Sequence, residues 1–212
     1  MRLLLVLALL LLLTSLLAHA QPPQRDTQLW SDFSIQKQLP DHFSVLAWTS
    51  LRFLDNVSRF GEQHVGGAFG YSPVHWFSTA AWYRFQRQVP TRAPLIHENR
   101  WFLEGTGRVP LPHHFEASDR NRFEWRLING TLSHRYRNRY QLEWKLKPVG
   151  PFVAGESSYD WRFHEWNRHR EYVGLRTEAV HHVSLETYFM HEDDSHSVPH
   201  KNVIGTALRF EY

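Results

Sequence analysis

Strict alternation of apolar and polar residues constrains the fold of this chain more than any other feature. It recurs along residues 21–212, most clearly at residues 43–53, 77–85 and 132–146. A β-strand has a side-chain period of two, so each such run describes a strand with one apolar and one polar face. No stretch of comparable length has the 3.6-residue period of an amphipathic helix. The sequence therefore predicts an all-β protein.

One hairpin can be placed in register from the sequence. Asn129-Gly130 separates two alternating runs, and both residue types accept the positive φ angles that a two-residue type I′ turn requires. Pairing Ile128 with Thr131 brings the apolar positions of both runs to one face. On the other face the same register sets Glu124 opposite Arg135, an opposite-charge pair.

The same register also creates a conflict. It sets Arg122 opposite Arg137, and like charges directly opposite each other destabilise a sheet. We therefore expect a carboxylate or a water molecule from elsewhere to lie between these two guanidinium groups.

About eleven strand-like runs can be counted. Breaks are expected at residues 39–41, 89–94, 148–151 and 193–199, and residues 105–112 form the longest segment expected to be irregular. Because single-chain bacterial outer-membrane barrels have even strand numbers, ten or twelve strands are expected, with twelve preferred.

The first twenty residues have the layout of a secretory signal peptide. A basic start at Met1-Arg2 is followed by an apolar run and by Ala18-His19-Ala20, which fits cleavage near Ala20. An N-terminal membrane anchor is the alternative interpretation. Residues 21–212 contain no apolar run of 18 residues, so the exported chain is expected to be either soluble or a closed barrel. We assign residues 1–20 to the signal peptide and residues 21–212 to a single β-barrel domain.

Composition excludes several classes of function. The 212 residues contain no cysteine, which excludes disulfides, thiolate metal sites and a cysteine nucleophile. Lys and Arg outnumber Asp and Glu by only 24 to 21, so nucleic-acid binding, which needs a concentrated basic patch, is not expected. No nucleotide-binding motif is present and no cofactor is expected. Histidines and carboxylates at residues 191–200 could bind a metal, but their irregular spacing favours a solvated acidic loop, and no metal site is predicted.

The amphipathic strands could bury their apolar face in a soluble protein or turn it toward lipid. Aromatic side chains favour lipid, because they gather at membrane interfaces. The alternation at residues 204–212 also ends on an aromatic residue, as in barrels inserted into bacterial outer membranes. The tryptophans assigned to the apolar face are Trp30, Trp48, Trp82, Trp101, Trp144 and Trp166.

We therefore predict an antiparallel up-and-down β-barrel of 10–12 strands, of transmembrane type, in the bacterial outer membrane; a periplasmic or secreted protein is the alternative. The residues expected to face lipid are Phe123, Trp125, Leu127, Tyr136, Trp144, Val173, Leu175, Leu208, Phe210 and Tyr212. Those expected to line the lumen are Arg122, Glu124, Arg126, Arg135, Arg137, Arg139, Glu143, Lys145, Arg168, Arg170, Arg176, Glu178 and Arg209.

Short motifs spread over residues 21–212 resemble a known family. They are Gln28-Leu29-Trp30, Glu98-Asn99-Arg100, Ser133-His134-Arg135-Tyr136-Arg137-Asn138-Arg139, Asn167-Arg168 and Tyr172-Val173-Gly174-Leu175. In this order they resemble the uncharacterised family labelled domain of unknown function 2490. The resemblance implies an exported bacterial protein of barrel type and supplies no catalytic residues. A proline-rich break at residues 109–112 departs from the family pattern.

The sequence contains one weak candidate for catalysis. His182, Ser184 and Glu186 share one strand face, and membrane-embedded lipid hydrolases use such residues. Residues two apart on a strand are separated by roughly 6–7 Å, too far for an automatic hydrogen bond. Polar filling of the interior explains this trio better, and no enzyme activity is predicted.

The leading functional hypothesis is a small outer-membrane barrel with an arginine-rich interior, acting as a narrow anion-leaning pore or as a structural barrel. Its expected partners are membrane lipid, the barrel insertion machinery through the C-terminal strand, and small anionic solutes. The alternatives are a barrel-embedded lipid hydrolase and a soluble exported β-barrel binding module.

Overall fold

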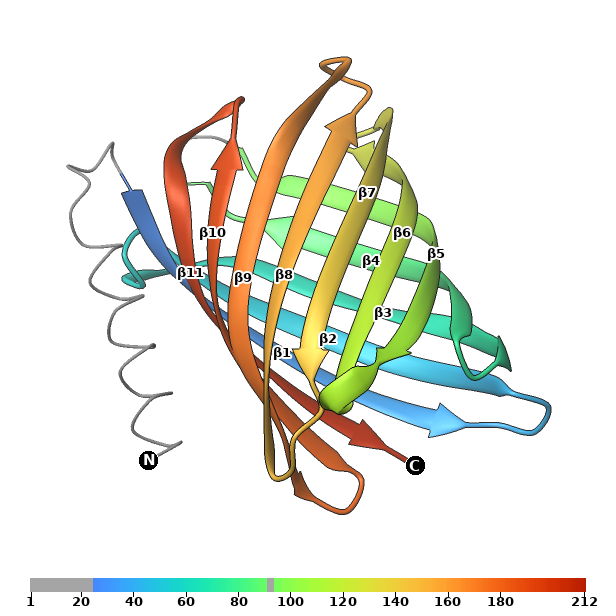
Figure 1. The fold of residues 1–212 in the computed structure, drawn as a ribbon. Helices are drawn as coiled ribbons and strands as arrows, with labels where there is room; N and C mark the ends of the chain where they lie inside the picture. The colour runs from blue at the N-terminus through green and yellow to red at the C-terminus, as the bar shows by residue number, and fades with distance from the viewer. Residues whose placement is uncertain (1–24, 91–93) are drawn as a thin grey trace, which may run out of the picture.

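The computed structural model describes residues 25–90 and 94–212, except the side chains of residues 179–180 and 197–199. These residues form one closed barrel of eleven strands (Figure 1). The strands are β1 (Arg25–Gln38), β2 (Phe43–Leu54), β3 (Arg59–Val74), β4 (Phe77–Gln88), β5 (Ile96–Leu111), β6 (Phe115–Ile128), β7 (Thr131–Trp144), β8 (Val149–Asp160), β9 (Glu165–Val180), β10 (Val183–Asp194) and β11 (Ser197–Glu211). A single turn of 3-10 helix, Pro112–His114, joins β5 to β6. Among the residues described, no helix has the length and apolar content needed to span a membrane. The predicted signal peptide, residues 1–20, lies outside the described residues.

The barrel closes through its first and last strands. Every other neighbouring pair is antiparallel, but β1 and β11 run parallel, in register from Arg25↔His200 to Gln36↔Glu211. An odd number of strands that alternate in direction can close only through one parallel pair. Eleven strands lie within the predicted range of 10–12, but the even number expected from known bacterial barrels is not found.

Parallel closure places the two ends of the described chain at opposite mouths of the barrel (Figure 1). We call the mouth where β1 begins the N-proximal mouth; the turns at residues 55–58, 129–130, 161–164 and 195–196 lie there. We call the mouth where β11 ends the C-proximal mouth; the turns at residues 39–42, 75–76, 145–148 and 181–182 lie there.

The predicted hairpin is confirmed residue by residue. β6 and β7 pair from Ile128↔Thr131 through Glu124↔Arg135. The turn residues Asn129 and Gly130 have φ angles of 46° and 88°, the left-handed region that a type I′ turn requires. Two alternations that agree in face, joined by a turn with one allowed geometry, are enough to fix a register from sequence.

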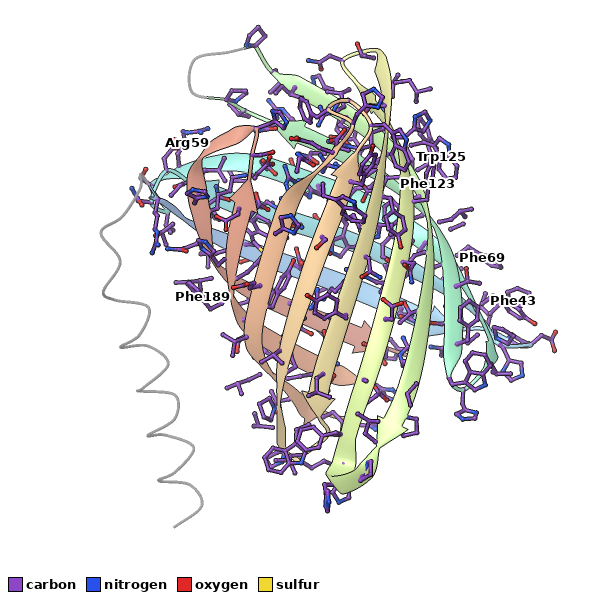
Figure 2. All side chains as sticks on the ribbon, turned by 45° about the horizontal axis from the view of Figure 1, so that its top comes forward. Phe43, Arg59, Phe69, Phe123, Trp125 and Phe189 are labelled. Carbon is purple, nitrogen blue, oxygen red and sulfur yellow. The ribbon has the colours of Figure 1, made fainter. Side chains whose placement is uncertain are left out.

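The apolar faces of the strands form the outer surface of the barrel. Phe43, Phe69, Phe123, Trp125 and Phe189 project from the barrel wall (Figure 2). No second layer of the described chain covers them, as a soluble sandwich would require. The residues predicted to face lipid belong to this outer surface: Phe123, Trp125, Leu127, Tyr136, Trp144, Val173, Leu175, Leu208, Phe210 and Tyr212. Phe210, near the end of β11, also borders an internal cavity. The predicted fold class, an all-β barrel of transmembrane type, is confirmed.

One polar patch interrupts the outer surface near the middle of β6 and β7. The Asn138 side-chain amide donates to Asp119 Oδ1 at 2.6 Å, and the Asn121 amide donates to Asp119 Oδ2 at 3.0 Å. These bonds satisfy the carboxylate within the barrel wall, which reduces the cost of holding polar groups on an apolar surface.

The expectation that residues 105–112 are irregular is wrong, because β5 continues to Leu111 and pairs with β6 through Pro110↔Glu116. The Arg108 N–H donates toward β4, to the Trp76 carbonyl at 2.8 Å. Backbone N–H groups two residues apart point the same way, so the nitrogen of Pro110 points toward the same side. Pro110 lies beyond the end of the β4–β5 ladder, where Phe77, the first residue of β4, pairs with Gly107. Proline removes no ladder hydrogen bond at such a free edge.

The prediction that six tryptophans lie on the apolar face is wrong for three of them. Trp30 is buried in the interior, where its indole donates to Gln28 Oε1 at 2.9 Å. Trp48 and Trp82 line an internal cavity. Trp101 and Trp166 are exposed on the outer surface, and Trp144 also lies there. Aromatic content alone does not reveal the face, because a barrel of this width also needs large side chains inside.

Candidate functional site

The interior of the barrel is built from the polar alternate positions of the strands. In the half nearer the N-proximal mouth, single carboxylates each hold two or more cations. Glu98 lies 2.6 Å from Arg100 and 2.8 Å from Arg126. Asp160 lies 3.2 Å from Arg126 and 2.5 Å from Arg135. The Arg126–Asp160 pair joins β6 to β8, so this contact passes over the inner face of β7, which lies between them in the sheet.

Glu124 occupies the centre of this network and is completely buried. Its carboxylate lies 3.2 Å from Arg100, 3.1 Å from Arg137 and 3.8 Å from Arg122. Arg122 and Arg137 are directly opposite each other in the β6–β7 ladder. Glu124 therefore contacts both of these arginines, but it comes from the hairpin itself, whereas the sequence predicted a partner from elsewhere.

The network continues around the wall to β11. Glu156 contacts Arg137 at 3.4 Å and Arg170 at 2.9 Å. Arg170 also pairs with Glu192 at 2.6 Å, and Glu192 with Lys201 at 2.7 Å. A continuous chain of alternating charges thus connects β5 to β11.

Side chains fill the half of the lumen nearer the N-proximal mouth. Every strand contributes at least one interior side chain there that is less than 9% exposed. They are Gln28, Ser50, His64, Arg84, Arg100, Glu124, Arg135, Asp160, Arg170, Glu192 and Val203. A small apolar cluster around Met190 and Phe152 adds to this filling. Interiors packed with paired side chains leave little room for a continuous water path.

Cavities begin near the middle of the barrel, beside side chains such as Arg84 and Arg170, and continue toward the C-proximal mouth. The central one has a volume of about 440 Å³ and is lined by nine arginines and five carboxylates, together with aromatic rings. A cavity of about 270 Å³ and one of about 640 Å³ share Arg209 with it. The last of these reaches His181 and His182 in a turn of the C-proximal mouth. We call these adjoining spaces the chamber.

The residues predicted to line the lumen lie in the ion network or around the chamber, and Arg122, Arg137 and Arg170 belong to both. Arg122, Glu124, Arg126, Arg135, Arg137, Arg168 and Arg170 belong to the ion network. Arg139, Glu143, Lys145, Arg176 and Arg209 lie around the chamber. Glu178 is at the rim, where its side chain is 71% exposed and pairs with Lys147 at 2.9 Å.

The candidate catalytic trio is not assembled. His182 lies in the turn between β9 and β10, and its ring stacks on Tyr212 with centroids 5.5 Å apart. Glu186 is held by Arg176 at 2.6 Å and Arg209 at 3.0 Å. Within the described residues, no hydrogen bond joins Ser184 to either partner.

The histidines at residues 191–200 are held by carboxylates. Asp193 Oδ1 lies 3.3 Å from His191 and 2.5 Å from His200, whereas His196 pairs with Glu165 at 2.5 Å. Among the described residues, no group of three or more histidines and carboxylates is arranged to hold a metal ion.

Several interior residues were missed from the sequence. Arg84, Arg100 and Arg108 line or border the chamber, and Glu156 bridges three arginines. Arg84 stood on the polar face of the alternating run at residues 77–85, so extending the same reasoning to β4 would have identified it. Glu156 gave no such signal, because Gly155, Ser157 and Ser158 blur the alternation around it.

Comparison with known proteins agrees with this architecture. The family model described as "Protein of unknown function (DUF2490)" matches residues 27–201. The chain belongs to this family. The match confirms the resemblance drawn from the short motifs, and the family's description assigns no activity. No curated protein matches the chain.

A solved structure supports the fold independently. The chain is similar to the crystal structure of the beta domain of the Bordetella autotransporter Brka, with a TM-score of 0.50 and 14% sequence identity. The similarity covers 73% of this chain and 78% of that one. At this identity the similarity concerns the fold alone: this family member is an outer-membrane-type β-barrel.

Proposed function

We propose that this protein is a structural outer-membrane barrel whose lumen is closed to ion flow in its N-proximal half and forms an anion-favouring chamber in its C-proximal half. Of the two roles suggested by the sequence, a narrow pore and a structural barrel, the buried ion network favours the second. The observation that carries this proposal is the completely buried Glu124, whose three arginine partners come from β5, β6 and β7.

The chamber favours anions because of its charge. Nine arginines and five carboxylates line its central cavity, and fixed positive charge raises the local concentration of small anions. Solutes would enter from the C-proximal mouth, where the chamber reaches His181 and His182. The proposal thus keeps small anionic solutes as partners without requiring them to cross the membrane.

The proposal includes the remaining expectations from the sequence. Residues 1–20 act as an export signal cleaved near Ala20, the exposed apolar surface contacts membrane lipid, and the C-terminal strand β11 is recognised by the insertion machinery.

Membrane insertion can be tested by extraction. Detergent, and not carbonate, should extract the protein from membranes, and the folded form should migrate differently on a gel before and after heating. Extraction by carbonate alone would contradict membrane insertion.

Planar-bilayer recording tests the closed lumen. Bilayers that contain the folded protein should show no channel steps above those of protein-free bilayers. Heat-modifiable migration of the same preparation shows that the protein is folded. Steady conductance would overturn the proposal in favour of a pore, and Arg139→Glu should then shift the reversal potential toward cations, because Arg139 lines the chamber.

A further inference from the structure

One wall of the chamber carries buried hydrogen-bond donors that have no acceptor. Arg52 Nε, Trp82 Nε1 and Arg84 Nε are all buried and lack a hydrogen-bond partner among the described residues. All three side chains line the central cavity. Arg52 comes from β2, and Trp82 and Arg84 come from β4; β3 lies between these two strands. Buried donors are almost always paired in folded proteins, so three unpaired donors on one wall indicate a missing acceptor.

The strand between these donors leaves space for that acceptor. At the level of Trp82 and Arg84, β3 presents Ala68 and Gly66 in register. Gly66 cannot carry a side chain, because a Cβ there would lie 2.3 Å from the Tyr83 carbonyl oxygen. Farther along β3, a hollow of about 220 Å³ adjoins the central cavity, and Trp82, Glu104 and Arg108 line both spaces. We call the part of the central cavity that Trp82, Arg84 and Arg108 line the niche.

The arginines around the chamber also differ in their partners. Arg84, Arg108 and Arg139 are the inward-facing arginines of the described residues with no carboxylate within ion-pair distance; the others each have at least one. Neutral groups hold these three: Arg108 donates to Ser78 Oγ at 3.0 Å, Arg139 donates to Gln141 at 3.0 Å, and the Arg84 guanidinium faces the Trp48 ring at 5.8 Å. Their positive charges are therefore left for an external anion.

We propose that the chamber binds a small tetrahedral oxyanion of the phosphate or sulfate class in the niche. Arg84 and Arg108 would supply the opposite charge, and the Trp82 indole would donate a hydrogen bond. A tetrahedral oxyanion presents acceptors in several directions, which suits donors from different strands better than the two oxygens of a carboxylate. This inference rests on the proposed chamber only in that the ligand must reach it from the C-proximal mouth.

Isothermal titration of the folded full-length chain in detergent tests the site, with inorganic phosphate as the probe. Wild-type protein should bind one phosphate, sulfate should compete, and acetate should compete at least about tenfold less well, because charge-assisted hydrogen bonds are lost. Arg84→Gln should weaken phosphate binding about tenfold to a hundredfold, and Arg84→Lys should restore part of the affinity.

Trp82→Phe is the sharper variant, because it removes one N–H and keeps a ring stacked on Phe102, whose centroid lies 5.3 Å away. It should weaken phosphate binding about fivefold. Trp101→Phe, which changes an exposed tryptophan of the outer surface, is the matched control and should leave affinity unchanged. Heat-modifiable migration shows that each variant is folded.

Two results would overturn the inference: no phosphate binding by the folded wild-type protein, or equal affinities in the wild-type, Trp82→Phe and Arg84→Gln proteins. Water molecules in the niche would produce either result. Failure of the proposed function is distinguishable, because a conducting barrel could still bind phosphate in detergent and a closed barrel could fail to bind it.

Discussion

Glu124 shows how a single residue can hold several arginines of the barrel interior together. Its carboxylate is completely buried and serves Arg100, Arg122 and Arg137 at once. Buried ions are stable only while their partners remain, because an unpaired charge in a low-dielectric interior keeps its full desolvation cost. Removing the shared carboxylate should therefore destabilise the barrel.

Glu124→Gln should strongly destabilise the barrel, since it keeps the shape of the side chain and leaves several buried guanidinium groups without their shared anion. The expected loss of unfolding free energy is about 3 kcal/mol or more, measured by urea unfolding in lipid vesicles with tryptophan fluorescence. Glu178→Gln, at an exposed ion pair of the rim, is the control and should cause no measurable change. Equal effects of the two substitutions would show that the network does not stabilise the barrel.

At the scale of elements, the β6–β7 hairpin depends on its turn. Gly130 has a φ angle of 88°, which L-residues with a side chain rarely adopt. Gly130→Ala should therefore lower the unfolding free energy by about 1 kcal/mol or more. Gly107→Ala is the matched control, because a Cβ at Gly107 would meet no atom within 4 Å and its φ is not positive. A loss as large at Gly107 as at Gly130 would contradict the turn-based explanation.

The strands β6, β7 and β8 also show which parts of the fold could be predicted from the sequence. The β6–β7 register was predicted because a two-residue turn and two unbroken alternations are local features. The same unbroken alternation predicted that Arg135, Arg137 and Arg139 share a face. β8 was not predicted, because Pro148 and Pro151 resemble a break and its small residues give little polarity contrast.

Features that depend on residues far apart in the sequence could not be predicted from the alternation of apolar and polar residues. Trp82 follows the alternation of β4 onto its polar face, and only the closed barrel shows that this face holds a cavity. Asp160 on β8 pairs with Arg126 on β6, two strands away in the sheet, and local alternation does not predict such a contact. The parallel pairing of β1 with β11 depends on the total strand count, which no single segment encodes.

At the scale of the whole molecule, that parallel pairing has a consequence for topology. Each strand of a membrane barrel crosses the bilayer once, so an odd number of strands puts the beginning of the first and the end of the last on opposite sides. Arg25 lies at the N-proximal mouth and Tyr212 follows the end of β11 at the C-proximal mouth. A barrel of ten or twelve strands would put both on the same side.

Because the chain has no native cysteine, the side of the membrane on which each end lies can be measured with single-cysteine variants and a membrane-impermeant maleimide. Arg25→Cys and Tyr212→Cys should differ: one should react in intact cells and the other only after the membrane is permeabilised. Asn56→Cys and Ser195→Cys, in turns of the N-proximal mouth, should react like Arg25→Cys, whereas Lys147→Cys should react like Tyr212→Cys. Reaction of both end positions from the same side would exclude parallel closure, because only an even number of crossings returns the chain to the side on which it began.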